Sequence, residues 1–122
     1  MDYTEQRVAL RSPLLIRQVR IEVAPEVFFG YATNISSKGI YIQTINPKPT
    51  GFQVRLRFNL PGDKETIECS AEVVWSRDYD SKTCRKPGMG LRFLDLSPEQ
   101  VARIDSFVQR KIYTQDLDIQ EV

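Results

Sequence analysis

The sequence predicts an all-β fold with one C-terminal helix, arranged as a six-stranded antiparallel β-barrel. Its apolar and polar residues alternate over short runs, which is the period of strands with one buried face. Six such strands in an open sheet would leave unpaired edges, and closure into a barrel removes them. The period becomes helical only after Ser97, and 122 residues are the size of one domain.

The first half of the chain contains three of the predicted strands. Their apolar sets are Val19, Ile21 and Val23, then Phe29, Tyr31, Thr33 and Ile35, then Ile40, Ile42 and Thr44. Residues 46–51 contain two prolines and a glycine and read as a loop.

A long hairpin follows, with the clearest alternation of the chain. One strand carries Phe52, Val54, Leu56, Phe58 and Leu60 on its apolar face, and the other carries Ile67, Cys69, Ala71, Val73 and Trp75. The turn between them is at residues 61–64, and Met89, Leu91 and Phe93 mark the last strand. We therefore expect Trp75 and most other aromatic residues to be buried.

The helix has a complete start signal. Ser97 is a suitable N-cap, Pro98 fits the first helical position and Gln100 completes a capping box. The expected buried face is Val101, Ile104, Val108 and Ile112, with Phe107 beside it. We divide the chain into a flexible arm at residues 1–12, a barrel with its helix at 13–113, and a fraying tail at 114–122.

Composition excludes several classes of function. The chain has no histidine, so His-based triads and zinc–histidine sites are ruled out. Cys69 and Cys84 lack metal-ligand spacing, and no metal, cofactor or catalytic set is expected, so we do not expect an enzyme. The net charge of +1 argues against broad nucleic-acid binding. No apolar run is long enough for a membrane span and no signal peptide is visible, so we expect a cytoplasmic protein.

Two short motifs stand out as candidate binding residues. Arg7 and Arg11 lie four residues apart, and the guanidinium group can bond phosphate or guanine bidentately while its flat face stacks on bases. Asn34, Ser36 and Gly39 form an Asn-x-Ser-x-x-Gly junction between two strands. Taken separately, the arginines also fit a solvated arm and the junction an ordinary turn. Together they fit an arm that folds back over a ligand held on the barrel.

The two motifs, RxxxR followed by [D/N]xSxxG, resemble those of the PilZ domain family. The similarity extends over roughly residues 5–112 and includes the run from Gly88 to Ser97 before the helix. The resemblance implies a six-stranded barrel with the helix across one mouth, and cyclic di-GMP as the ligand. Arg7 and Arg11 would then grip phosphates and guanines, and Asn34, Ser36 and Gly39 would line the barrel side.

Two positions depart from the commoner pattern. Asn34 stands where Asp is more frequent, and an amide has one acceptor where a carboxylate has two, which predicts weaker binding. Gln6 stands where a basic residue often precedes the first arginine, which leaves open whether one ligand molecule or an intercalated pair binds.

The function that we expect is a cyclic di-GMP-binding signalling module, which orders its N-terminal arm on ligand binding and relays the signal to a downstream protein. The alternative is a PilZ-like protein-interaction module that does not bind the nucleotide. A barrel that binds single-stranded nucleic acid is a third class, against which the net charge and the expected burial of the aromatic residues argue.

Overall fold

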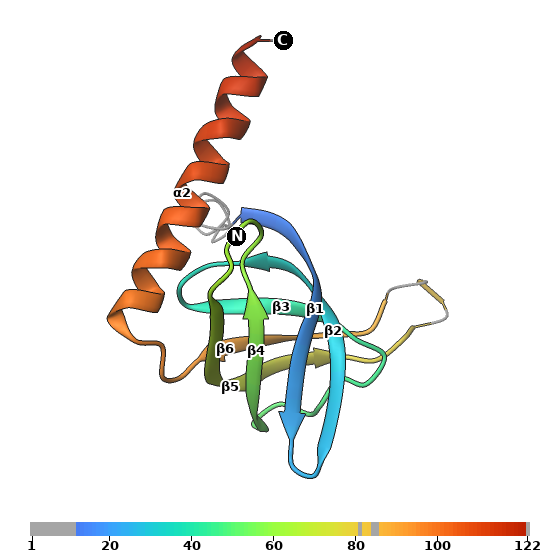
Figure 1. Cartoon of the computed structure of the whole chain (residues 1–122). Helices are drawn as coiled ribbons and strands as arrows, with labels where there is room; N and C mark the ends of the chain where they lie inside the picture. Colours follow the sequence, from blue (N-terminus) through green and yellow to red (C-terminus); the bar gives the residue numbers. More distant parts are fainter. Residues whose placement is uncertain (1–11, 81, 84–85, 122) are drawn as a thin grey trace.

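The computed structural model describes residues 12–80, 82–83 and 86–121, and in them it shows six strands and one helix. These elements are β1 (Ser12–Val23), β2 (Glu26–Ile35), β3 (Gly39–Gln43), β4 (Gln53–Asn59), β5 (Thr66–Arg77), β6 (Gly88–Phe93) and α2 (Pro98–Glu121). All neighbouring strands are antiparallel, and they close into a barrel in the order β1-β2-β3-β6-β5-β4 (Figure 1). The predicted fold class is confirmed.

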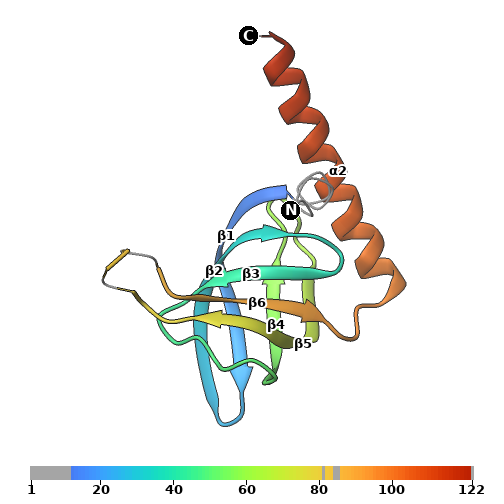
Figure 2. The same ribbon diagram turned by 180° about the vertical axis from the view of Figure 1, so that it is seen from behind.

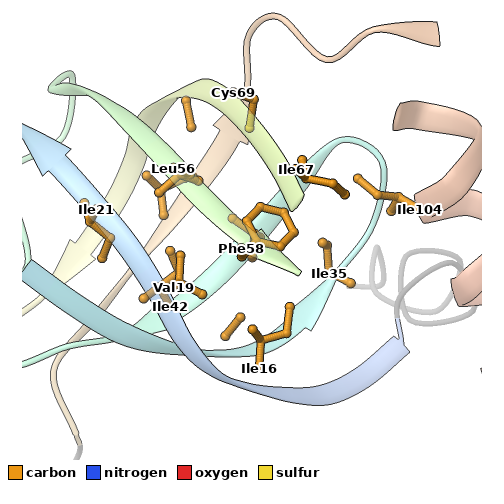
Figure 3. Close-up of a cluster of buried hydrophobic side chains, with 14 of the residues drawn as sticks. Ile16, Val19, Ile21, Ile35, Ile42, Leu56, Phe58, Ile67, Cys69 and Ile104 are labelled. Carbon is orange, nitrogen blue, oxygen red and sulfur yellow. The ribbon is translucent and has the colours of Figure 1, made fainter. Parts of the chain in front are cut away.

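The barrel interior is filled by the alternating apolar residues of the strands. In β4, Val54, Leu56 and Phe58 are buried while Arg55 and Arg57 face solvent. Figure 3 shows Phe58 and Leu56 together with isoleucine and valine side chains from the neighbouring strands. Burial of one such side chain is worth about 1.5–3 kcal/mol, so this cluster supplies most of the driving force for folding.

The prediction that Phe29 and Tyr31 of β2 lie on the same face as the buried Ile35 is wrong. Phe29 and Tyr31 are 50% and 53% exposed, whereas Ala32 is fully buried. The pairing of β2 with β3 shifts register between Ala32 and Asn34, and this irregularity returns Ile35 to the core. An extra residue in one strand changes which of the following side chains face the core. Counting alternate positions in the sequence does not show where such a residue lies.

Trp75 is also not a core residue. Val73 is buried, but the register of β5 against β6 shifts between Val73 and Trp75, and the indole is 42% exposed. Phe52, expected on the buried face, precedes β4 and is 43% exposed. The expectation that most aromatic residues are buried is therefore wrong: of those that the structure describes, only Phe58 and Phe107 are buried, and the outer surface of the barrel carries aromatic rings.

The helix begins as predicted. The Ser97 amide donates to Gln100 Oε1 at 2.9 Å, and the Gln100 amide donates to Ser97 Oγ at 3.1 Å, which together make the capping box. Ile104, Phe107 and Val108 are buried against the barrel, and Figure 3 shows Ile104 directed toward the core cluster.

The helix continues beyond its predicted end at Tyr113, as far as Glu121. Residues 114–121 contain neither glycine nor proline, so no residue in this segment interrupts a helix. Its C-terminal part projects past the barrel, at the end opposite the β1–β2 hairpin (Figures 1 and 2). Residues 1–11 of the expected arm lie outside the described residues.

Candidate functional site

The Asn-x-Ser-x-x-Gly junction lies at the end of β2 and the start of β3, next to the beginning of β1. Asn34 pairs with Pro13 of β1 on one side and with Tyr41 of β3 on the other. Its half-buried side chain lines a hollow of about 300 Å³ on the outside of the barrel, at the lower end of the size range of ligand pockets. The other walls of the hollow come from β3, β5 and β6.

Two aromatic residues, Tyr41 and Trp75, line this hollow. The rings of Tyr41 and Trp75 are stacked with their centroids 5.2 Å apart and their planes at 13°. The two glycines of β6 make room for them: a Cβ atom at Gly88 would collide with the Tyr41 hydroxyl, and one at Gly90 with the indole nitrogen of Trp75. Glycine inside a strand weakens it, so its presence here is explained by this close approach of the rings.

Arg77 adds the positive charge of the described site. Its guanidinium carbon lies 5.5 Å from the centre of the Trp75 ring, which is within cation–π range. One Nη2–H donates to the Tyr41 hydroxyl at 3.1 Å and Nε–H donates to the Lys86 carbonyl at 3.2 Å. A guanidinium group has five N–H donors, which suits it to an anionic or guanine ligand.

Ser36 and Gly39 shape the connection between β2 and β3. The Ser36 amide donates to the Gly39 carbonyl at 2.9 Å, and Ser36 Oγ accepts the Lys38 amide at 3.2 Å. A Cβ atom at Gly39 would collide with the carbonyl oxygen of Leu91 on β6. Glycine is therefore required at position 39 for the close approach of two strands, and not for a positive φ.

The structure places the residues of the Asn-x-Ser-x-x-Gly motif close together, and it does not describe the arginine motif. Asn34, Ser36 and Gly39 lie at one corner of the barrel, beside the start of β1 at Ser12. Arg7 and Arg11 lie outside the described residues.

The sequence reasoning missed the wall made by Tyr41, Trp75 and Arg77. The usable signal was the Gly88-x-Gly90 pair inside a strand, because such glycines mark a place where a ring or a backbone comes close.

The thiol of Cys69 takes no part in this site. It is buried in the core, and burial raises its pKa to about 12, so it is a thiol and not a reactive thiolate at neutral pH. Within the described residues, no group of His, Cys, Asp and Glu side chains is arranged to hold a metal ion. Of the helical residues that the structure describes, no stretch is both long and apolar enough to cross a membrane.

Comparison with solved structures finds the same fold in several proteins. The Bacillus subtilis inhibitor of motility MotI/DgrA superposes with a TM-score of 0.73 at 21% identity, over 86% of this chain and 50% of that one. The PilZ domain of Escherichia coli YcgR, solved with cyclic di-GMP, gives 0.67 at 15% identity, over 92% and 95%. The Borreliella burgdorferi protein PlzA, solved in complex with cyclic di-GMP, gives 0.50 at 16% identity, over 97% and 50%.

This chain therefore spans about half the length of the Bacillus and Borreliella proteins and nearly all of the YcgR domain. No curated protein matches the chain. The family model of the PilZ domain matches residues 5–110. This range includes the arginine motif, the Asn-x-Ser-x-x-Gly motif and all six strands of the barrel. On that match, and with the fold that the structure shows, the chain belongs to the PilZ domain family.

Proposed function

We propose that this protein is a receptor module for cyclic di-GMP, which binds on the outer wall of the barrel between Asn34 and the stacked rings of Tyr41 and Trp75. The observation that carries the proposal is the hollow of about 300 Å³, where an amide, an exposed indole and the Arg77 guanidinium lie together. Two similar PilZ-family structures were solved with cyclic di-GMP, which supports the choice of ligand.

The aromatic wall suits a purine base. A guanine can lie against the exposed part of Trp75, and stacking of this kind is worth about 1–3 kcal/mol per base. Asn34 offers an amide oxygen to a guanine N–H, and Arg77 offers N–H donors to guanine O6 and N7 or to a phosphate.

Arg7 and Arg11 complete the proposed site from the N-terminal arm. Ser12, the first described residue, pairs with Ile35, and Arg11 directly precedes it in the sequence. Ser12 therefore begins β1 beside the corner formed by Asn34, Ser36 and Gly39, which supports a role for the preceding arm there. We propose that the two guanidinium groups grip the phosphates and guanines, that the arm becomes ordered as they do so, and that a downstream protein in the cytoplasm recognises the ordered surface.

The test is an isothermal titration of cyclic di-GMP into the full chain and into the Arg7→Ala/Arg11→Ala variant. A charge-assisted hydrogen bond is worth about 1.5–3 kcal/mol, so loss of either arginine weakens binding by about one to two powers of ten. Arg57→Ala is the matched control, because Arg57 is an exposed arginine whose partner is Glu68 and which does not line the hollow.

Binding that the double variant loses and Arg57→Ala keeps supports the receptor function, and the stoichiometry distinguishes one bound nucleotide from a pair. Equal binding by the wild type and the double variant overturns the assignment of the arginines. No heat with any of the proteins overturns the receptor function itself.

A further inference from the structure

A second hollow, of about 420 Å³, lies on a different part of the barrel surface. We call it the rim groove and define it by Phe29, Tyr31, Gln43, Ile45, Lys86 and Pro87. We propose that the rim groove docks a short amphipathic helix of a partner protein, which presents apolar side chains to the aromatic residues and a carboxylate to Lys86.

The groove belongs to an apolar patch on the outer surface of the barrel. Val27, Phe29 and Tyr31 follow one another at every second position of β2 and are 41%, 50% and 53% exposed, and Ile45 is 95% exposed. The outer face of β4 is different, because its exposed residues are Gln53, Arg55, Arg57 and Asn59. Clustered apolar side chains on one exposed strand face are typical of an interaction surface.

The lining of the groove indicates how a partner would bind. Residues 26–30 of β2 pair with β1 but not with β3, so only a short backbone edge lies beside Phe29. The groove itself is lined largely by apolar side chains, and an amphipathic helix binds through side chains of this kind.

The charge in the groove selects the chemistry of the partner. Among the described residues that line it, Lys86 is the only charged one and none is a carboxylate. Glu26, at the start of β2, is already occupied by Lys48 at 2.7 Å. A second copy of this chain docked face to face would bring two Lys86 side chains and no acid into one interface, which disfavours a symmetric dimer. A partner that carries an acidic residue beside its apolar ones could form an ion pair with Lys86.

The side chain of Arg77 connects this groove to the proposed nucleotide site. Arg77 holds the Lys86 carbonyl with Nε–H and the Tyr41 hydroxyl with Nη2–H, while lying over the Trp75 ring. The neighbouring Pro87 carbonyl accepts the Thr44 amide at 3.2 Å at the edge of the groove. A ligand that draws the Arg77 guanidinium toward itself competes with the bond to Lys86 and alters the groove. This relay rests on the proposed function, whereas the docking surface does not.

The experiment selects binders from a displayed library of helix-forming peptides of about 16 residues, long enough to be helical in water, on the full wild-type chain. The selected peptides are then synthesised, and their affinities are measured by fluorescence anisotropy. Phe29→Ala is expected to weaken peptide binding about tenfold, because it removes a large apolar side chain from the interface. Lys86→Glu is expected to weaken binding because it replaces the positive charge in the groove with a negative one. A peptide whose glutamate is changed to lysine is expected to recover affinity for Lys86→Glu. Phe52→Ala is the matched control, since Phe52 is also a half-exposed phenylalanine but does not line the groove.

Each outcome decides the proposal. Peptides rich in apolar and acidic residues that respond to Phe29→Ala and Lys86→Glu, but not to Phe52→Ala, support it. No specific binder, or binders indifferent to both groove variants, overturns it. A wild-type dimer in sedimentation that Phe29→Ala converts to monomer also overturns it and identifies the occupant as a second copy.

The relay has a separate readout. Peptide affinity is measured with and without cyclic di-GMP, on the wild type and on Arg77→Ala. A change caused by the nucleotide in the wild type, and absent in Arg77→Ala at a cyclic di-GMP concentration that saturates this variant in calorimetry, supports the relay. An affinity that cyclic di-GMP leaves unchanged overturns the relay but not the docking surface, and calorimetry of the nucleotide alone tests the receptor function independently.

Discussion

The indole of Trp75 lies directly against Gly90, its cross-strand partner on β6, with no room between them for a Cβ atom. The glycine thereby determines where the ring lies on the outer surface of the barrel, and with it the wall of the proposed nucleotide site.

The substitution Gly90→Ala should therefore weaken cyclic di-GMP binding, although residue 90 itself is not expected to contact the ligand. The added methyl group displaces the indole, and loss of part of the base stacking corresponds to about tenfold in affinity by calorimetry. In a Trp75→Ala background the same glycine substitution should have little further effect, because the ring that it displaces is gone. Additive losses in the double variant would contradict this dependence.

Binding can be followed through the protein itself, because Trp75 is the only tryptophan of the chain. We expect cyclic di-GMP to change its fluorescence emission, and Arg7→Ala/Arg11→Ala to abolish that change. Trp75→Phe should keep most of the affinity in calorimetry since it keeps an aromatic face, whereas Trp75→Ala should lose about ten- to a hundredfold. Equal affinities for the two variants would show that the ring does not stack on a base.

Gly39→Ala should lower stability more than it alters the ligand contacts. The new Cβ atom meets the Leu91 carbonyl oxygen, and overpacking of this kind costs about 1–3 kcal/mol. Chemical denaturation measures that loss, and Ser36→Ala provides the comparison because it removes only an exposed bond to the Lys38 amide. Unchanged stability together with lost nucleotide binding would instead give Gly39 a direct role at the ligand.

Ile104→Ala should destabilise the fold by about 2–5 kcal/mol, because Ile104 is fully buried and its truncation leaves a cavity between α2 and the barrel. The adjacent Asp105 is exposed, so Asp105→Ala should change stability by only about 0.5 kcal/mol or less. Urea unfolding of both variants measures the difference. Similar effects at the two positions would mean that the helix contributes little to the core.

The ion pair between Asp63 and Arg103 predicts a pH dependence of stability. The hydrogen bond from Arg103, 2.6 Å long, lowers the pKa of Asp63 below its ordinary value of 3.8. Because the pKa is lower in the folded than in the unfolded chain, the stabilisation is complete above 3.8 and disappears as the pH falls through the folded value.

Asp63→Asn should therefore be less stable than the wild type near neutral pH, and the two curves of stability against pH should converge in acid. Glu22→Gln is the control, since the pair of Glu22 with Arg20 is exposed and longer, at 3.7 Å. A constant offset between wild type and Asp63→Asn at all pH values would contradict the assignment to ionisation.

Much of the architecture follows from local pattern. The alternation from Val54 to Leu60 identifies a strand and its buried face, because side chains on a strand alternate between its two sides. The capping residues Ser97 and Gln100 identify the start of the helix, because they satisfy backbone amides that the helix leaves unpaired.

The order of residues along the chain also predicts the junction between β2 and β3 at Asn34, Ser36 and Gly39. Such turn-forming residues between two strands carry a local signal, whatever their partners elsewhere in the fold. The end of the helix carried no comparable signal, since residues 114–121 include no residue that stops one.

The aromatic wall and the rim groove depended on tertiary structure. Trp75 and Phe29 were in phase with buried neighbours by simple alternation, and register shifts in the pairing of their strands turned them outward. A register shift arises from how two strands distant in sequence fit together, so one strand alone does not encode it. Local patterns in the sequence are enough to predict the strands, the helix and the junction motif, whereas the pairing of distant strands establishes which aromatic rings face solvent and which residues meet at each hollow.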